Sequence, residues 1–245
     1  MTEASDATYI GTELELFASA KNWKSYLGTR IRPHVGRRVL EVGAGLGGTT
    51  GHLISDSVEH WTCLEPDPVL AGQISVESAG PQEVRVVTGT ISDIGEADLY
   101  DTIIYIDVIE HIEEDREELT RAWECLEISG NLIVLAPAHQ WLMSEFDQAV
   151  GHFRRYNKAS LAAIAPQPSS QVALQYLDTF GLLASLANKT ILQSGSPNPG
   201  QVSFWDRVLV PISRRFDKVL GYNLGRSVLG IWRKSDARFA HQSTS

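Results

Sequence analysis

Short apolar runs along the chain alternate with longer segments in which apolar residues recur every third or fourth position. Several of the short runs are rich in Val and Ile and end at turn residues, which is the pattern of buried strands. Seven runs are predicted as strands: 37–42, 60–65, 84–88, 100–107, 131–137, 171–177 and 227–234. Alternation of strand and helix patterns predicts an α/β fold, with a doubly wound, mostly parallel seven-stranded sheet between layers of helices.

The helical patterns lie between these strands and towards both ends of the chain. Helices between strands are predicted at 48–55, 66–79, 113–128, 158–165 and 179–193. Residues 14–31 have roughly helical spacing and predict one or two helices over the edge of the sheet. Residues 194–201 have the composition of a loop, and the amphipathic segment 202–220 that follows is expected to break at Pro211.

Composition narrows the class of protein. A length of 245 residues with 43% apolar residues suits one domain of generous size. The net charge of −9 does not favour a nucleic-acid partner, since such proteins usually present a basic face. Neither Cys63 nor Cys125 lies in a C-x-x-C pair, the N-terminus lacks a signal-peptide pattern, and no apolar run reaches membrane-spanning length. We therefore expect a cytoplasmic protein.

A glycine-rich segment follows the first predicted strand. Gly43, Gly45 and Gly48 satisfy the pattern G-x-G-x-x-G, in which glycines allow a tight turn and a close approach of the backbone to a ligand. Glu65 lies 22 residues after Gly43, at the end of the second strand, where a carboxylate can hold ribose hydroxyls. These features predict a nucleoside-binding α/β domain and leave open whether the ligand is NAD or S-adenosylmethionine (SAM).

Glu41 distinguishes between NAD and SAM as the predicted ligand. It is a carboxylate at the end of a strand that should be buried, and such a group needs a donor or a cation. It would repel a pyrophosphate and attract the ammonium of SAM. With Gly43, Gly45 and Gly47 it resembles the first motif of class I SAM-dependent methyltransferases, E/D-x-G-x-G-x-G. The resemblance implies that Glu41 and the glycine backbone hold the methionine part of SAM, and that Glu65 holds its ribose.

Later segments extend the resemblance over about residues 10–160. The loop after the third strand is similar to the adenine-contacting loop of the family, and the end of the fourth strand to the part beside the sulfonium. The implied residues are Gly89, Thr90 and Ile91 for adenine, and Ile106 and Asp107 for the sulfonium. The family often has an acid near Thr90, which this chain lacks, and Asp93 is the candidate to replace it.

The resemblance also implies an organisation for the chain. We expect a Rossmann-like methyltransferase fold in a single domain, 1–245, with helical cap elements at both ends. Its parts are an N-terminal helical cap at 1–35, a SAM-binding core at 36–160, and acceptor-side strands with an amphipathic lid at 161–245.

Two clusters offer acid–base chemistry. His111 follows the fourth strand and is a candidate general base, because imidazole titrates near neutral pH. The alternative is that it packs against the cofactor. The second cluster, G-H-F-R-R-Y, resembles a subgroup of bacterial methyltransferases that act on small molecules, often sugars, lipids or secondary metabolites. That resemblance implies His152 as base and Arg155 and Tyr156 as acceptor-orienting residues. The alternative is a basic turn whose arginines pair with acids of helix 113–128.

A metal site would join the two clusters. Asp107, Glu110 and His111, with His152 as a later histidine, are similar to the E-x-x-E-H pattern of ubiquinone-pathway O-methyltransferases and small-RNA 2′-O-methyltransferases. Oxygen and nitrogen ligands suit Mg²⁺ or another divalent ion. This chain has the shorter Asp107 where those families have glutamate, and many D-x-x-E-H methyltransferases bind no metal. The metal is therefore an alternative to a metal-free site.

The C-terminal segment departs from the charge of the rest. Residues 201–245 hold eight basic and three acidic residues, a net charge of +5. Basic and aromatic residues on the amphipathic stretch 202–220 suit either a lid over the acceptor, with Trp205 in contact with it, or a membrane or lipid-linked acceptor. The expected break at Pro211 favours the lid.

The predicted function is methyl transfer from SAM to a small-molecule acceptor at oxygen or nitrogen. An NAD(P)-dependent oxidoreductase is the first alternative, although neither a Tyr-x-x-x-Lys pair nor a zinc-binding cysteine set is present. A non-catalytic nucleoside-binding module is the second.

Overall fold

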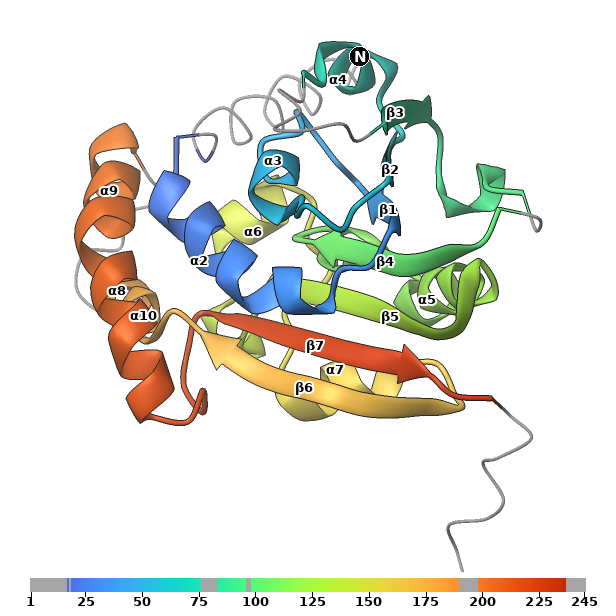
Figure 1. Cartoon of the computed structure of the whole chain (residues 1–245). Coiled ribbons are helices and arrows are strands. Elements are labelled where there is room, and N and C mark those ends of the chain that lie inside the picture. The colour runs from blue at the N-terminus through green and yellow to red at the C-terminus, as the bar shows by residue number, and fades with distance from the viewer. Residues whose placement is uncertain (1–16, 18, 76–82, 96–97, 190–197, 237–245) are drawn as a thin grey trace, which may run out of the picture.

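A single sheet of seven strands forms the centre of the molecule (Figure 1). The computed structural model describes residues 17, 19–75, 83–95, 98–189 and 198–236. The strand order is β3-β2-β1-β4-β5-β7-β6, and β7 runs antiparallel to the other six strands. The strands are β1 (Arg38–Val42), β2 (His60–Glu65), β3 (Glu83–Thr88), β4 (Tyr100–Ile106), β5 (Leu126–Pro137), β6 (Ser169–Leu177) and β7 (Ser227–Lys234). The predicted mostly parallel, doubly wound sheet is confirmed.

Helices cover both faces of the sheet (Figure 1). In the first two thirds of the chain the described α-helices are α2 (Lys21–Ile31), α3 (Thr50–Leu53), α4 (Pro68–Gln73), α5 (Asp115–Glu124), α6 (Glu145–Ala149) and α7 (Lys158–Ile164), and the short turn η1 (Arg32–His34) follows α2. Successive strand residues face opposite sides, so the adjacent and fully buried Val39 and Leu40 belong to different cores. Leu40 packs with α5 and α7, and Val39 packs with α2 and α3.

Two predictions about helix placement are wrong. The helix α2 covers a face of the sheet rather than its edge, because its apolar side chains pack among those of β1, β2 and β5. The part of that prediction that covers residues 14–16 and 18 lies outside the described residues, as do 76–79 and 190–193 of two other predicted helices. The predicted helix 113–128 ends early, at Glu124, since Leu126 already pairs with Tyr100 at the start of β5.

The described C-terminal helices pack against one another as one unit. It consists of α8 (Thr179–Ala187), α9 (Pro199–Phe204), the π-helical turn η6 (Trp205–Leu209) and α10 (Val210–Val219). The predicted break at Pro211 is wrong. Proline lacks an N–H and its ring presses on the preceding turn, and the π turn just before Pro211 has the wider spacing that relieves this conflict. The chain therefore passes through Pro211 as a helix.

Three buried acids attach this unit to the rest of the molecule, and we call them the acid network: Asp178, Asp206 and Asp217. Asp206 accepts the backbone N–H of Trp23 at 2.9 Å and so caps the first turn of α2. Asp217 accepts the backbone N–H groups of Asp178 and Thr179, at 2.7 and 3.0 Å, at the start of α8. Asp178 accepts the backbone N–H of Gly181 at 3.0 Å in the first turn of α8. Helix N-termini leave such N–H groups unsatisfied, so each acid meets a structural need.

No helix in the described ranges is long and apolar enough to cross a membrane.

Candidate active site

The loop after β1 has a backbone conformation that needs glycine. Gly43, Gly45 and Gly47 have φ angles of 67°, 56° and 71°, a region that side chains with a Cβ rarely adopt. At Gly43 a Cβ would also lie 2.5 Å from Val108. The loop thus presents bare backbone next to the end of β4, which is the side of the sheet where nucleoside ligands bind in this class of fold.

Glu65, at the end of β2, holds that loop in place. Its side chain is buried, and its carboxylate accepts the backbone N–H of Gly45 at 2.8 Å and that of Asp67 at 3.1 Å. A carboxylate has about four acceptor positions, so capacity remains for hydroxyl donors. The same side chain can therefore order the glycine loop and receive a ribose.

Glu41 is buried between β1, β2 and α3. One carboxylate oxygen accepts the hydroxyl of Thr50 at 2.6 Å and the indole N–H of Trp61 at 3.0 Å. Burial raises the pKa of Glu41 to about 7, and these two hydrogen bonds oppose the rise. The charge of Glu41 is thus poorly compensated within the protein and would gain from a cation at the loop.

This raised pKa predicts a pH-dependent stability. The unfolded carboxyl ionises near its ordinary pKa of 4.5 and the folded one near 7, so stability is lost as the pH rises through that window. In Glu41→Gln this loss should be absent, because the amide oxygen can still accept from Thr50 and Trp61. We expect the variant to exceed the wild type by up to about 3 kcal/mol above pH 7 and to match it near pH 4.

The measurement is urea unfolding at several pH values, without ligand. Glu114→Gln, at an exposed carboxyl, is the control and should leave the pH profile unchanged. Equal stability of Glu41→Gln and wild type at pH 8 would contradict the burial of an uncompensated charge.

A cavity of about 1040 Å³ extends from the glycine loop past the end of β4 to the C-terminal helices. Most of the residues predicted for the site line it: Glu41, Gly43, Gly45, Ile106, Asp107, Glu110, His111, His152, Arg155 and Trp205. Gly47, Glu65, Gly89, Thr90, Ile91 and Tyr156 are not among its lining residues. The volume is at the upper end for a ligand site, enough for two small molecules side by side.

Asp107 directly follows β4 and lines this cavity, at a φ of 53°. Enclosure by the cavity walls raises its pKa, and the positive charges of Arg226 and Arg155 oppose that shift.

The predicted adenine loop is ordered by its own acid. Asp93 accepts the backbone N–H and the hydroxyl of Thr90, at 2.8 and 3.0 Å, and so caps the turn η2 (Ile91–Asp93). These bonds hold the pKa of Asp93 below its ordinary value. Gly89 donates its N–H to the carbonyl of Glu65, which attaches the loop to the end of β2. The loop therefore adjoins Glu65, while one oxygen of Asp93 is engaged within the loop.

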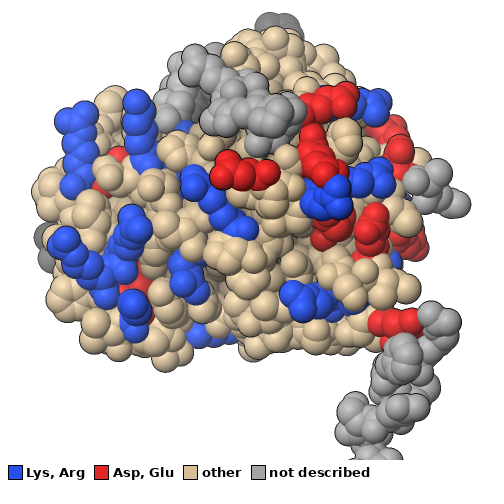
Figure 2. All heavy atoms as spheres, in the orientation of Figure 1, with Lys and Arg blue, Asp and Glu red and all other residues tan. Residues whose placement is uncertain are grey.

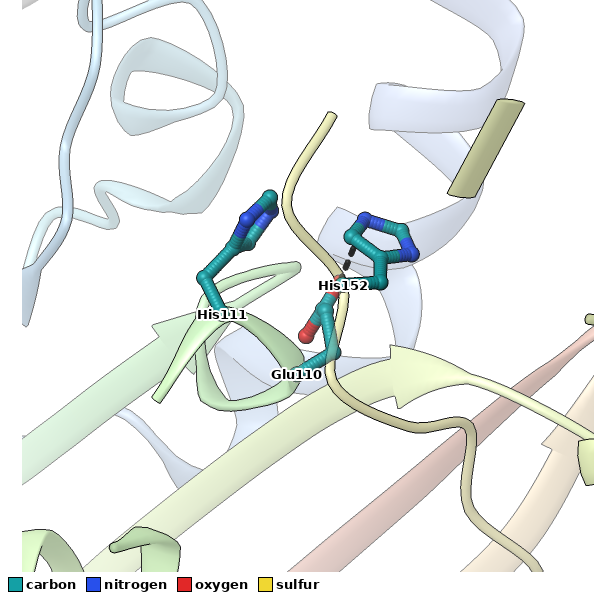
Figure 3. Close-up of side chains that lie close together, drawn as sticks. All are labelled: Glu110, His111 and His152. Atoms are coloured by element: carbon teal, nitrogen blue, oxygen red, sulfur yellow. Dashed lines mark ion pairs between the residues drawn. The ribbon is translucent and has the colours of Figure 1, made fainter. Parts of the chain in front are cut away.

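Two predicted clusters meet in the cavity (Figure 3). Glu110 and His111 come from the turn η3 (Ile109–His111), and His152 comes from the segment after α6. Their ligand atoms all lie within 4.8 Å of one another, and Asp107 is not part of this group. Glu110 is fully buried, with its Oε1 3.9 Å from Nε2 of His152. The His111 and His152 rings meet edge to face at 4.5 Å.

Asp147 is the partner of His152 that the sequence analysis missed. It lies on α6 and accepts from Nδ1 of His152 at 3.0 Å and from the Arg155 guanidinium at 2.7 Å. Burial by itself would raise the pKa of Asp147, but these partners hold it well below the ordinary value. A proton on Nδ1 leaves Nε2 of His152 as a free base or ligand atom. The only sequence signal for this pairing is that an acidic residue lies five positions before His152. The helix that carries it is too short to predict from sequence.

His111 has a different electrostatic setting. Burial and the neighbouring His152 lower its pKa to about 4, and only the carbonyl of Val150 opposes this. At neutral pH it is therefore an uncharged and weakly basic imidazole.

The other residues of G-H-F-R-R-Y face away from the cavity. Arg154 forms an ion pair with Asp115 on α5, at 2.7 Å. For Arg154 this confirms the alternative that the arginines pair with acids of the predicted helix 113–128. The hydroxyl of Tyr156 donates to the same carboxylate at 2.7 Å, and the residue is buried. The structure thus brings His152 and Arg155 to the cavity, and Arg154 and Tyr156 to the start of α5.

Lys24 and Arg226 are cations at the cavity that were not predicted. Lys24, on α2, lies against the glycine loop, where a Cβ on Gly48 would come within 2.9 Å of its Nζ. Arg226 stacks over the ring of Trp205, 4.6 Å from its centre, and lies 4.0 Å from Asp178. Burial lowers the pKa of Lys24 and of Arg226. Their sequence context, a helix face and a loop, gives no sign of this position.

Comparison with known proteins agrees with this geometry. Residues 40–134 match a family model described as a methyltransferase domain. No curated protein sequence matches the chain significantly.

Solved structures share the fold at low identity. The YcgJ protein of Bacillus subtilis has a TM-score of 0.56 at 16% identity, over 86% of this chain and 98% of its own. NodS of Bradyrhizobium japonicum, an N-methyltransferase in complex with S-adenosylhomocysteine, has 0.56 at 13%, over 89% of each chain. A chain from the complex of the Haloferax volcanii Trm112 methyltransferase activator with a methyltransferase has 0.62 at 12%, over 96% of each chain.

The matched region begins in β1 and ends in β5, so it contains the glycine loop, Glu65 and the end of β4. Residues 40–134 therefore match a methyltransferase domain, which favours methyl transfer over the NAD(P)-dependent oxidoreductase and the non-catalytic module. The seven-stranded fold around this domain is shared with the solved N-methyltransferase structure.

Proposed function

We propose that this methyltransferase acts on a small-molecule acceptor, a sugar, lipid-linked compound or secondary metabolite, at oxygen or nitrogen. The observation that supports it most is the single cavity lined both by the glycine loop and by the His152 cluster. A macromolecular acceptor would need an open surface at the reacting groups, whereas His152 has only 9% of its side chain exposed. A ligand of limited size is favoured because the reaction centre is enclosed.

SAM fits the cofactor side of the cavity. When bound, it supplies a methyl group on a sulfonium, and the C–S bond breaks to leave S-adenosylhomocysteine. The bare loop at Gly43 can approach the methionine part, Glu41 can balance its ammonium, and Lys24 can pair with its carboxylate. Glu65 accepts the ribose hydroxyls, with the Gly89–Ile91 loop next to it for adenine.

The acceptor side supplies a base and charges that orient the acceptor. We assign His152 as the base, because Asp147 fixes its tautomer and Nε2 is free to take the proton that the acceptor loses. Arg155 and Arg226 add positive charge to the cavity wall, and Trp205 offers an aromatic face. The acceptor atom attacks the methyl carbon while its proton passes to His152, so charge and atoms balance.

The test is turnover with the purified protein and SAM, followed as S-adenosylhomocysteine release against a panel of sugars, polyprenyl-linked sugars, phenols and amines. Methylation of at least one enclosed-size acceptor is expected, with loss of activity in the presence of excess S-adenosylhomocysteine. Turnover of an RNA or protein substrate with none of these small molecules accepted would overturn the assignment.

A divalent ion at the same place is the second candidate arrangement. The grouping of Glu110, His111 and His152 within 4.8 Å favours it, and Asp147 would then orient His152 as a ligand rather than as a base. In that case the ion would bind the acceptor oxygen directly, and the histidines would not take a proton.

A further inference from the structure

The C-terminal helices expose an unusual share of the apolar surface. Fifteen large apolar side chains are exposed in the described part of the chain, and eight of them lie between residues 183 and 224. We call these eight the outer helical face: Leu183, Leu186, Phe204, Val208, Phe216, Val219, Leu220 and Leu224. Val219 is 82% exposed and Phe204 57%, and a cluster of this kind on one surface marks an interaction site.

Packing between the helices joins these residues into one surface. The rings of Phe180 on α8 and Phe216 on α10 meet at 5.2 Å. Leu183 and Leu186 follow Phe180 at intervals of three residues and so lie along the same side of α8. The apolar stripe of α8 therefore continues onto α10 rather than facing a separate direction.

Basic residues surround this apolar surface. Arg207, Arg214, Arg215 and Lys218 are exposed on η6 and α10, and none of them forms an ion pair with another described residue. On the face drawn in Figure 2, Lys and Arg gather over the helices at the left of the view, and the visible Asp and Glu lie mostly towards the right. This face is therefore electrically polarised, although the net charge of the chain is −9.

The acid network explains why this side has so little negative charge. The two acids of the helical unit, Asp206 and Asp217, are 4% and 0% exposed and face inward as caps of α2 and α8. The carboxylates of this helical unit are therefore buried in the protein, whereas its Arg and Lys side chains are exposed to solvent. An anionic partner that is also apolar beneath its charges would match this surface.

The outer helical face adjoins the acceptor side of the cavity. Phe204 belongs to both, because it is exposed on α9 and also lines the cavity. Ala184 and Lys189, on and just after α8, line the same cavity. Trp205, which was expected to contact the acceptor from a lid, lines the cavity, while Phe216 on α10 is exposed outside its lining. One helical unit therefore serves both as the wall of the acceptor site and as an outward surface.

We propose that α8, α9 and α10 dock this protein on an anionic lipid bilayer, with the outer helical face in the headgroup layer. The main sequence argument against such docking was a helix broken at Pro211, and the helix is continuous there. Interfacial helices combine an apolar face with Lys and Arg that bind anionic headgroups, as this unit does. Docking places the cavity opening beside the bilayer. Resting on the proposed function, this gives an acceptor with an apolar chain a route past Phe204.

Vesicle flotation with the full chain tests the proposal. The probes are vesicles of phosphatidylcholine with phosphatidylglycerol, and vesicles of phosphatidylcholine alone, each at low and high salt. We expect flotation with the anionic vesicles only, and its loss at high salt because ions screen the headgroup charge. Equal binding to both vesicle types, or none at low salt, would overturn the proposal.

Two charge-matched variants locate the surface. Arg214→Gln with Arg215→Gln should lower the partition onto anionic vesicles by about thirtyfold, the effect of two basic residues near such a surface. Arg85→Gln with Arg116→Gln removes two exposed charges elsewhere and should leave it unchanged. Equal losses in both variants would mean general charge attraction and would contradict a specific face.

A third variant separates the apolar contribution. Val208→Ser with Val219→Ser should weaken flotation without changing the charge. Self-association of the chain through this face, with no binding to vesicles, would assign the surface to a second copy and overturn bilayer docking. Because flotation requires neither SAM nor an acceptor, its failure would leave the proposed methyl transfer intact, and failed turnover with normal flotation would do the reverse.

Discussion

Replacing Glu65 by alanine is expected to weaken SAM binding by at least about tenfold while the protein remains folded. Hydrogen bonds to a charged group contribute about 1.5–3 kcal/mol each, and Glu65 offers them both to the ribose and to the backbone of the glycine loop. The variant loses the direct contacts to the ribose. It also loses the carboxylate that accepts the backbone N–H of Gly45 and so holds the glycine loop. Titration calorimetry with SAM gives the affinity, and circular dichroism reports the fold.

Asp67→Ala is the matched control. Asp67 is two residues away and caps α4 by accepting the N–H of Val69 at 2.7 Å, so its loss costs helix stability but no ligand contact. We expect wild-type SAM affinity in that variant. An unchanged SAM affinity in Glu65→Ala would refute the ribose assignment and with it the alignment of β2 with the family.

Loss of the His152 side chain should abolish most methyl transfer. General acid–base catalysis contributes about 10²–10⁴-fold, so kcat of His152→Ala should fall by a factor in this range while SAM affinity stays near wild type. Asp147→Asn should lower kcat in the same direction, because an amide holds the Nδ1 proton less firmly than a carboxylate. The measurement is steady-state kinetics with an accepted substrate. His60→Ala, at an exposed histidine at the start of β2, is the control.

Chelation separates a base from a metal ligand. If His152 is a base, activity should persist in EDTA, and His111→Ala should cost much less than His152→Ala. If Glu110, His111 and His152 hold a divalent ion, activity should fall with EDTA and return with Mg²⁺ or Mn²⁺, and either histidine variant should prevent that recovery. A full kcat in His152→Ala would exclude both roles.

The sheet was predictable because burial on two faces leaves little freedom in sequence. Strands β1, β4 and β5 each contain a run of buried apolar residues, and β7 was predicted with the bounds that it has, Ser227–Lys234. The glycine loop was predictable for a related reason, since positive φ at three nearby positions restricts the residue type. Predictions from local sequence patterns failed where tertiary contacts determine the secondary structure. Leu126 joins β5 because Tyr100 pairs with it, which no window around residue 126 reveals.

Of the site, the sequence predicted only those residues that lie in short sequence motifs. Glu41, His111 and His152 lie in recognisable motifs. Asp147 and Arg226 line the same cavity because the fold brings their segments there, and no local motif marks them. Pro211 shows the limit of a propensity argument. Its cost in a helix is real, but a π turn just before it removes the conflict, and such a turn has no clear sequence pattern.

The position of β7 has a consequence for how the molecule is assembled. In the described sheet β6 is hydrogen-bonded only to β7, and β7 is inserted between β5 and β6. During synthesis, β1 to β5 can pair as soon as they leave the ribosome, but β6 has no neighbour until residues 227–234 have emerged. Closing the loop from β5 to β7 brings together segments about ninety residues apart, a slow step with a large entropic cost. The cofactor half of the sheet can therefore form early, and the acceptor half is completed in the last step of folding.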